Sequence, residues 1–457
     1  MQQPHLVRLS ALALAVAGAL AFGQAHASGF QLKENSVKAQ GRSFAGSGVA
    51  TDDASVVVNN PATMTQFDGT TVQTDVTVID VNAEFNGGGY DITGRPLTGG
   101  DGGNAGGVTP VPAMSMIHKF DNGLTVGAMV SAPFGLKTEY DRGWVGRYSA
   151  LTSEVKTVDL TLAAAYDIVP NHLSVGIGVI WERAEAELSR AVDFGTLAFQ
   201  QLPPAARPTA PAFARPQNAD GEGVVKGDDT GMGWLVGINF RPTENLAIGL
   251  THRSEIDHEI DGTVDWTVPA ANRAVFDANP VTRVLFQDGR ARAEVTLPSI
   301  TTVSIAYKLG DAFTLYGDYV ETDWHALQEL RIDYANPDPD TVEEFRWSDT
   351  RFWSVGADWK FSEAWTLRAG YGYDETPTTF ATRTPRLPDE DRKWYSLGAT
   401  WSLNEQLEVS FAYTRIEPDE PRVGIVTPAT TPGGGRTLFG SYESDVNLFG
   451  VSAQYKF

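Results

Sequence analysis

Apolar and polar residues alternate strictly along much of the chain, and this pattern restricts the folds that are open to it. In the segment 449–457 every odd-numbered position is apolar or aromatic, and every even-numbered position is small or polar. The same period of two recurs at 158–167, 173–182, 394–403 and 407–414. Because successive side chains of a strand point to opposite faces, each run predicts a strand with one apolar face. Runs of about ten residues have the length that a tilted strand needs to cross the hydrocarbon layer of a membrane.

The connections between these runs separate a membrane barrel from a soluble sandwich, whose strands also alternate. Short turn signals lie at 121–123, 170–171, 242–245, 310–311, 362–363 and 404–405. Long connections rich in Gly, Pro and Asp lie near 86–110, 134–152, 188–228, 266–290, 327–344, 377–392 and 418–440. Short and long connections follow one another in strict alternation. Loops of this length are hard to place in a compact sandwich, whereas short turns at one end and long loops at the other are typical of outer-membrane barrels.

The six short and seven long connections join 14 strands. We therefore predict an all-β fold, a 14-stranded antiparallel transmembrane β-barrel over residues 69–457. An even number of strands places both ends of the barrel at the short-turn end, which in outer-membrane barrels faces the periplasm. The C-terminal Phe457, preceded by alternating aromatic residues, agrees with a barrel of the outer membrane.

The first 27 residues predict a secretory signal peptide that is cleaved on export. Arg8 supplies a positive charge near the start, Leu9–Phe22 is an apolar run, and Ala25 and Ala27 provide small residues at the cleavage position. The apolar run is too short to span a bilayer as a helix. Export followed by barrel assembly predicts a location in a bacterial outer membrane.

Residues 28–68 do not alternate and form a separate predicted domain. They contain scattered glycines together with Phe30, Leu32, Phe44 and Phe67. The segment is either a periplasmic tail or a plug (hatch) inside the barrel lumen. A disordered tail would be poorer in such apolar residues, so we favour the plug.

The composition restricts the function classes that remain. Cys is absent, which excludes disulfides, Cys-based zinc sites and a thiol nucleophile. The formal charge of −22 argues against nucleic acid as a partner. His252 and His258 match no common metal spacing, and no Gly-x-Ser-x-Gly motif occurs. We expect no enzymatic activity, no cofactor and no metal site; an outer-membrane lipase with a dispersed Ser and His stays open as an alternative.

Four short blocks of sequence lie in order along the mature chain. They are Gly29–Leu32, then Asp52–Ser55 with Asn60–Ala62, then Pro133–Leu136 with Trp144 and Tyr148, then Leu387–Arg392 with Trp394. In this order they resemble the FadL/TodX family of outer-membrane transporters for hydrophobic compounds. The resemblance implies a 14-stranded barrel, an N-terminal hatch and the uptake of long-chain fatty acids or related hydrophobic molecules.

Two long loops carry apolar residues to which the resemblance assigns a role in ligand capture. These residues are Phe194, Leu197 and Phe199 in the loop at 188–228, and Phe276 and Phe286 in the loop at 266–290. Such side chains either pack between the loops or bind an apolar ligand. In the family a first hydrophobic groove lies between these loops. An inner apolar site is expected near the mature N-terminus, around Phe30.

A fatty-acid carboxylate in a poorly solvated site needs a cation or several donors. In the family a basic residue just beyond the fifth strand helps to line the inner site. Arg190 is the nearest match here, about two residues out of register. The alternative for Arg190 is a rim position that faces lipopolysaccharide or solvent. Glu343 and Glu344 occupy a second basic position of the family, which favours a neutral aromatic hydrocarbon or alkane as the alternative substrate.

Two motifs are candidates for gating. The segment Ser131-Ala132-Pro133-Phe134-Gly135 interrupts the third predicted strand, because Pro cannot donate to the ladder and Gly permits a bend. This is either a strand end or, as in the family, an inward kink that opens the wall sideways. Asn60-Pro61-Ala62 predicts a structural turn, with hatch gating together with Ser28 and Gly29 as the alternative.

The expected partners follow from these predictions. We expect a hydrophobic small molecule as ligand, an outer membrane with its lipopolysaccharide as surroundings, no nucleic acid, and a monomer. A general diffusion porin is the alternative transport class.

Overall fold

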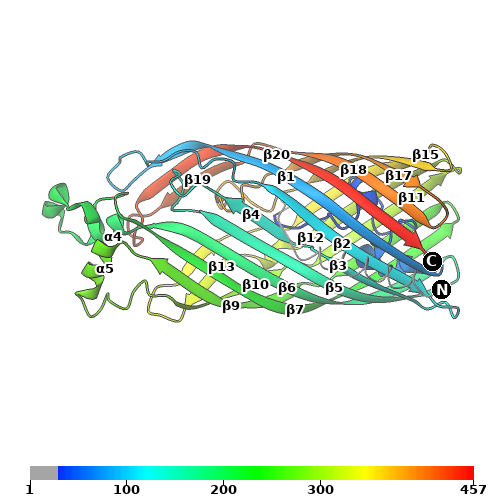
Figure 1. The fold of residues 1–457 in the computed structure, drawn as a ribbon, viewed down its shortest axis with the longest axis horizontal. Coiled ribbons are helices and arrows are strands. Elements are labelled where there is room, and N and C mark those ends of the chain that lie inside the picture. The colour runs from blue at the N-terminus through cyan, green and yellow to red at the C-terminus, as the bar shows by residue number, and fades with distance from the viewer. Residues whose placement is uncertain (1–28) are drawn as a thin grey trace, which may run out of the picture.

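The computed structural model describes residues 29–457, which form one closed barrel of antiparallel strands (Figure 1). The predicted signal peptide and Ser28 lie outside the described residues. Twenty strand segments form a single sheet. The sheet closes because the first strand, β1 (Thr70–Tyr90), pairs along its length with the last, β20 (Arg436–Lys456). Six strands consist of two consecutive segments each, so the wall has 14 strands and the predicted strand number is confirmed.

The strands divide into continuous and interrupted ones. The other continuous strands are β2 (Val108–Lys119), β5 (Thr152–Val169), β6 (Leu173–Asp193), β7 (Asp220–Thr243), β16 (Trp365–Asp374) and β17 (Arg392–Ser402). The interrupted strands are β3 (Thr125–Ser131) with β4 (Gly135–Glu139), β8 (Leu246–Arg253) with β9 (Ile256–Thr267), β10 (Gly289–Leu297) with β11 (Ile300–Leu309), β12 (Phe313–Thr322) with β13 (Glu329–Tyr334), β14 (Thr341–Glu344) with β15 (Thr350–Lys360), and β18 (Leu407–Pro418) with β19 (Arg422–Thr427).

All helices within residues 29–457 are short, and they lie inside the barrel, in the loops or at a strand interruption. The N-terminal segment contains α2 (Val37–Gln40), α3 (Val56–Asn59) and η1 (Pro61–Gln66). The long loops contain α4 (Phe194–Gln201), η2 (Pro204–Thr209), η3 (Ala212–Ala214) and α5 (Ala270–Asp277), and η4 (Trp324–Ala326) follows β12. Among the described residues, no helix has the length and apolar character required to span a membrane.

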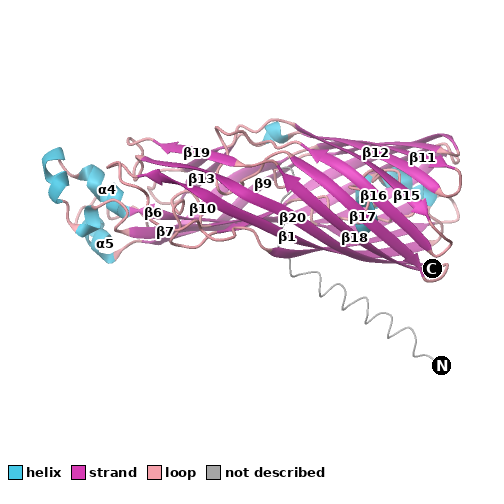
Figure 2. Ribbon diagram, turned by 90° about the horizontal axis from the view of Figure 1, so that it is seen from above, coloured by secondary structure: helices cyan, strands magenta, loops and turns pink. Residues whose placement is uncertain are grey.

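All six predicted short turns join neighbouring antiparallel strands, at the end of the barrel where the C-terminus lies (Figure 1). Gly123 (φ 85°) and Gly310 (φ 67°) take up left-handed backbone conformations in two of these turns, where glycine costs least. The helices α4 and α5 lie at the opposite end (Figures 1 and 2). The loop after β6 is shorter than predicted, because β6 and β7 stay paired from Leu173–Phe240 out to Asp193–Asp220.

Aromatic side chains on the outer face form two bands that bracket the aliphatic surface. Near the short turns the rings of Phe313 and Trp359 stack, with centroids 5.8 Å apart. Toward the long loops Tyr371 contacts both Trp353 (5.6 Å) and Tyr395 (5.4 Å). Two aromatic bands around an apolar zone are typical of a barrel that spans an outer membrane.

The N-terminal segment, residues 29–68, lies inside the barrel (Figure 2). Its helix α2 contacts β1, β17, β18 and β20, whereas η1 contacts β3, β5, β6 and β7 on the facing side of the wall. Glycines of the wall make these close contacts possible. A Cβ atom at Gly370 would lie 2.1 Å from the carbonyl carbon of Arg42, and one at Gly237 would lie 2.1 Å from Oδ1 of Asn60. Any larger residue there would displace the segment.

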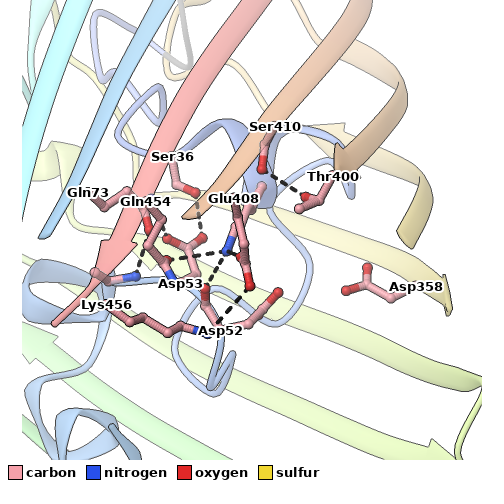
Figure 3. A network of polar contacts seen from close by, with 12 residues as sticks. Ser36, Asp52, Asp53, Gln73, Asp358, Thr400, Glu408, Ser410, Gln454 and Lys456 are labelled. Atoms are coloured by element: carbon pink, nitrogen blue, oxygen red, sulfur yellow. Dashed lines mark hydrogen bonds and ion pairs between the residues drawn. The ribbon is translucent and has the colours of Figure 1, made fainter. Parts of the chain in front are cut away.

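Partly buried ion pairs join the N-terminal segment to the wall near the short-turn end (Figure 3). Lys38 Nζ donates to the Asp52 carbonyl (2.6 Å) and pairs with Glu408 Oε2 (2.8 Å). Arg368 Nη2 pairs with Asp52 Oδ2 at 3.1 Å. Burial alone would raise the pKa of the Asp52 carboxyl, but Lys38 and Arg368 hold it well below its usual range. The carboxylate of Asp52 is therefore a fixed negative charge between two cations.

A second set of contacts extends this network along the segment. Arg42 Nη1 pairs with Asp358 Oδ2 at 2.8 Å, and Arg368 Nε approaches the same oxygen at 3.3 Å. Asp53 accepts hydrogen bonds from Ser36 and from Gln73 Nε2. The residues of the segment that make these contacts are far apart in sequence. They bind to β1, β15 and β16, so the segment is held as one unit.

Candidate functional site

An apolar cavity of about 1180 Å³ lies between the N-terminal segment and the long loops. Its wall side chains come mainly from β9, β10, β13 and the halves of β5 to β7 nearest the long loops. Representative lining residues are Leu136, Val225, Ile260, Val295, Ile332 and Leu387. The apolar lining suits a ligand of many methylene groups, each of which contributes about 0.8 kcal/mol on burial.

Phe30 lies at the centre of the aromatic cluster at the inner end of this cavity. Its ring centroid is 4.9 Å from that of Trp324, 5.9 Å from Phe134 and 5.8 Å from Trp347. The preceding residue, Gly29, has a left-handed backbone (φ 60°), and its N–H donates to Asp389 Oδ2 at 3.0 Å. The structure thus places Phe30 in the lining of the cavity. Its role in ligand binding stays a prediction.

Arg386 is a charged residue of the cavity lining that was not predicted from the sequence. Its Nε donates to Glu343 Oε1 (2.7 Å) and its Nη1 donates to Ser153 Oγ (3.0 Å). Arg383, also in the lining, pairs with Glu390 at 2.6 Å. Both arginines come from the loop between β16 and β17, which folds back into the lumen. The only feature of the sequence that could have indicated this site is the pair of arginines three residues apart, Arg383 and Arg386.

Arg190 lies beside the main cavity. It lines a smaller adjoining pocket of about 320 Å³, together with Glu343 and Arg386. Glu343, which in sequence replaces a basic residue of the family, is neutralised by Arg386. Glu344 is exposed and pairs with Arg346. Because Arg386 compensates the negative charge of Glu343, this charge repels a carboxylate ligand less than an unpaired glutamate would.

The predicted capture residues of the two long loops do not line this cavity. Phe194, at the start of α4, is fully buried and contacts Phe286 (centroids 4.9 Å apart) and Phe276 of α5 (6.0 Å). Leu197 and Phe199 are half-buried on the same helix, α4. The three phenylalanines pack the loops against each other. Of the two alternatives, packing between the loops and binding of an apolar ligand, the structure therefore shows the packing. A capture groove beside them stays a prediction.

The wall is interrupted where the third strand was expected to break. Strand β3 ends at Ser131 and β4 begins at Gly135. Beyond the break β4 pairs with β5 alone, and the part of β2 at 108–113 pairs with β1 alone. The hydrogen-bonded wall thus has a gap between β2 and β4.

Part of the N-terminal segment covers this gap from the inside. Leu32 N–H donates to the Pro133 carbonyl (2.7 Å), and Gly135 N–H donates to the Phe30 carbonyl (2.8 Å). Gln31 and Phe134 thereby form an isolated antiparallel bridge. The segment 30–32 separates the cavity from the gap, so a ligand passing from one to the other has to displace it.

The Asn60-Pro61-Ala62 turn fixes the segment to the wall. Asn60 Oδ1 accepts from Ala62 N–H (3.2 Å), and its Nδ2 donates to the Ile238 carbonyl (3.0 Å). Asn60 thus caps η1, and Pro61 occupies the first helical position, where its missing N–H costs nothing. This geometry favours the structural interpretation of the motif; its share in gating stays a prediction.

One group of side chains among residues 29–457 has metal-ligand spacing. Donor atoms of Asp323, His325 and Asp349 lie within 4.8 Å of one another. His325 is largely exposed, and its Nδ1 is already bonded to Asp349 Oδ1 at 2.6 Å. We assign no metal to this group.

The stability with which the N-terminal segment packs inside the barrel depends on pH through the carboxyl of Glu34. Burial raises the pKa of its carboxyl to about 7, against hydrogen bonds from its own N–H and that of Lys33. The seated segment therefore binds the proton more tightly than the exposed chain does. The resulting stabilisation is complete below pH 4.5, the ordinary pKa, and is lost as the pH rises to about 7, a difference on the order of 3 kcal/mol.

The variant Glu34→Gln is therefore expected to raise the melting temperature of the purified protein at pH 8 and to leave it unchanged at pH 5. The amide mimics the protonated acid and removes the cost of burying a charge. Thermal unfolding at the two pH values measures this. An equal shift at both would show that the charge of Glu34 has no part in it.

The chain matches known proteins over nearly its whole length. Residues 18–457 match the family model described as outer membrane protein transport protein (OMPP1/FadL/TodX). The long-chain fatty acid transport protein of Escherichia coli O6:H1 is 28% identical, with 100% of both chains covered. Outer membrane protein P1 of Haemophilus influenzae Rd is also 28% identical, over 97% of this chain and 98% of its own.

Solved structures agree with these sequence matches. A Pseudomonas aeruginosa FadL homologue superimposes with a TM-score of 0.86 at 26% identity, covering 94% of this chain and 100% of the homologue. The Pseudomonas putida toluene transporter TodX has a TM-score of 0.67 at 17% identity, with 94% and 100% covered. At that identity the second likeness concerns the fold alone.

Proposed function

We propose, since this chain belongs to the OMPP1/FadL/TodX family of outer-membrane transport proteins, that it takes up long-chain fatty acids across the outer membrane. The observation that carries the proposal is the apolar cavity with Arg386 in its lining. Such a cavity suits an amphiphile, with methylenes against the apolar wall and the carboxylate at the guanidinium. Relatives over the full length are named for the same substrate.

The proposed route has three stages. Ligand first partitions onto the extracellular loops around Phe194 and Phe286. It then enters the cavity above Phe30. Movement of the segment 30–32 away from Pro133–Gly135 finally lets it leave sideways through the gap between β2 and β4 into the membrane. In this proposal the N-terminal segment is the hatch, the protein is a monomer among lipopolysaccharide, and no catalytic step occurs.

A neutral hydrocarbon is the second candidate substrate, and the ion pairs of the cavity lining support it. The three arginines of the cavity lining already have acidic partners. Arg386 pairs with Glu343, and Arg383 pairs with Glu390. Arg292 pairs with Glu259 and Asp261. A carboxylate therefore has to compete with Glu343 for Arg386, whereas a hydrocarbon leaves these pairs intact. Aromatic compounds or alkanes would then be the cargo of the same route.

Replacing Arg386 by Ala separates the two substrates. If Arg386 binds the carboxylate, affinity for palmitic acid is expected to fall roughly 10-fold or more, the value of a charge-assisted hydrogen bond. Affinity for methyl palmitate changes far less, because nearly the same area is buried. Binding is measured by quenching of tryptophan fluorescence with brominated analogues, since Trp347 lines the cavity.

The matched variant Arg190→Ala is the control for this measurement. Arg190 lies in the adjoining pocket, and its removal is expected to affect the acid less than removal of Arg386 does. Equal losses for acid and ester in Arg386→Ala would mean that Arg386 acts through shape. Tight binding of the ester and weak binding of the acid by the unaltered protein would favour the hydrocarbon.

The proposed orientation in the membrane has its own test. An epitope inserted at the exposed Ala205, between α4 and η3, is expected to be reached by antibody on intact cells. An epitope at Asn404, in a short turn, is expected to be reached only after the outer membrane is opened. Antibody binding at Asn404 on intact cells would reverse the orientation.

A further inference from the structure

A second cavity of about 820 Å³ lies on the short-turn side of the segment 30–32. It shares no lining residue with the first cavity. The N-terminal segment contributes Leu32, Lys33 and Phe44, and the wall contributes Pro133, Ile300 and Phe352. It combines these apolar side chains with the charged groups of Lys33, Arg253 and Asp318. The two cavities are therefore separate chambers, and the segment 30–32 divides them.

Lys33 is the distinctive residue of this second chamber. The side chain is buried, and its ammonium lies 4.2 Å from the centroid of the Phe352 ring. Within residues 29–457 Lys33 forms no ion pair at the 4 Å limit that defines the others. Burial lowers the pKa of the Lys33 ammonium, and the negative charges of Asp374, Glu34 and Asp318 oppose this shift. A buried lysine of this kind in a cavity is a candidate for ligand binding.

The other charged groups of the chamber already have partners. Arg253 pairs with Asp159 (2.5 Å) and with Glu182 (2.9 Å). Asp318 accepts from the N–H groups of Gly46 (2.8 Å) and Ser47 (3.2 Å) and from the Ser47 hydroxyl. Of the two cations in the lining, Arg253 is thus bound to two carboxylates, whereas Lys33 lies against the Phe352 ring.

The position of the chamber connects Lys33 to the gap in the wall. Ala132 and Pro133, at the break between β3 and β4, are part of the lining. Lys33 follows directly on the segment 30–32, which bonds to Pro133 and Gly135. Any movement that uncovers the gap therefore opens the first cavity beside Lys33.

We propose that the second chamber is a binding site for the carboxylate of the transported amphiphile, with Lys33 as its cation. The inference rests on the proposed function, and it adds a second binding site for the acid along the proposed route. The head group leaves Arg386, meets Lys33 next to the gap, and stays there while the tail enters the membrane. A cation–π contact with Phe352 holds the ammonium in place until the acid arrives.

The first test compares uptake of palmitic acid and hexadecanol by cells that carry the full-length protein. Lys33→Gln removes the charge, and Lys33→Arg keeps it. Lys33→Gln is expected to lower uptake of the acid about 10-fold, the loss of one charge-assisted bond, and to leave uptake of the alcohol unchanged. Lys33→Arg is expected to retain most of the acid uptake.

The control variant is Lys38→Gln, at the other buried lysine of the same segment. Lys38 pairs with Glu408 and lies outside the second chamber, so its loss is expected to affect acid and alcohol alike. An equal effect of Lys33→Gln on acid and alcohol, or no effect on the acid, would overturn the inference. Absence of acid uptake by the unaltered protein would instead overturn the proposed function.

The second test locates the head group without relying on transport. Crystals of the full-length protein with 2-bromohexadecanoic acid mark the carboxylate end by the anomalous signal of bromine. We expect bromine beside Lys33 in the unaltered protein and its loss in Lys33→Gln, with bromine beside Arg386 in both. Bromine beside Arg386 alone in the unaltered protein would overturn the inference. Failure of both sites would count against the proposed function.

Discussion

A disulfide between Gln31→Cys and Phe134→Cys is expected to stop uptake almost completely while leaving ligand binding in place. The bond would tie the segment 30–32 to the strand break that it covers. Ligand could still enter the first cavity from the loops, but the way to the gap would stay closed. Reduction of the bond is expected to restore uptake in the same cells.

The geometry at this position suits the cross-link. Leu32 donates to Pro133 and Gly135 donates to Phe30, so Gln31 and Phe134 face each other as a non-hydrogen-bonded antiparallel pair. Such pairs have Cα atoms about 4.5 Å apart, within the range that a disulfide spans. The natural chain has no Cys, so no other pairing competes.

Uptake of a radiolabelled fatty acid, with and without reductant, measures the effect. The two single-cysteine variants control for the loss of either side chain, above all for the loss of the Phe134 ring. Equal uptake in the oxidised and reduced states would mean that the segment 30–32 does not have to move, and the proposed route would be wrong.

The second large effect is expected from Arg368→Met, which should make the barrel leak ions. Arg368 is buried and contacts the carboxylates of Asp52 and Asp358. Methionine fills similar space and leaves the buried carboxylate of Asp358 and the partly exposed carboxylate of Asp52 with one cation fewer. Removing one partner of a buried ion pair costs on the order of 3–5 kcal/mol. The N-terminal segment is expected to leave its seat at the short-turn end.

Conductance of the purified protein in a planar bilayer measures this leak. Arg331→Met is the matched control, because Arg331 is half exposed and pairs with Glu329 outside the lumen. Acidification to pH 5 is not expected to reproduce the leak, since the pKa of Asp52 lies well below its usual range. Open conductance of the unaltered protein would instead indicate a diffusion porin.

The strand number and the turns could be predicted from the sequence because both depend on local patterns. Period-two alternation shows which face is apolar, and residues such as Asn122 and Gly123 mark the turns. The break at Pro133 was predicted for the same reason. Five further interruptions were missed, although Pro298, between β10 and β11, was a signal for one of them.

The lining of the cavity could not be predicted because it depends on how long loops fold back. Arg386 reaches the cavity only because the loop between β16 and β17 enters the lumen. Arg190 lies close in sequence to the basic position expected from the family, yet its side chain lines a smaller neighbouring pocket instead of the main cavity. The phenylalanines of α4 and α5 were located in the correct loops, but which of two packings they adopt depends on the partner loop.

The half of β2 at 108–113, which pairs with β1 but not with β4, has a consequence for how the barrel assembles. This stretch contains Pro110 and Pro112, neither of which has an N–H to offer to a neighbour. Prolines in sheets are confined to edges, and a strand that lacks donors is a poor template for another strand. Neither β4 of the same barrel nor a strand of a second copy finds a hydrogen-bond donor at these two positions, so pairing at this edge is disfavoured. The gap between β2 and β4 is thus favoured by the residue types of β2 itself.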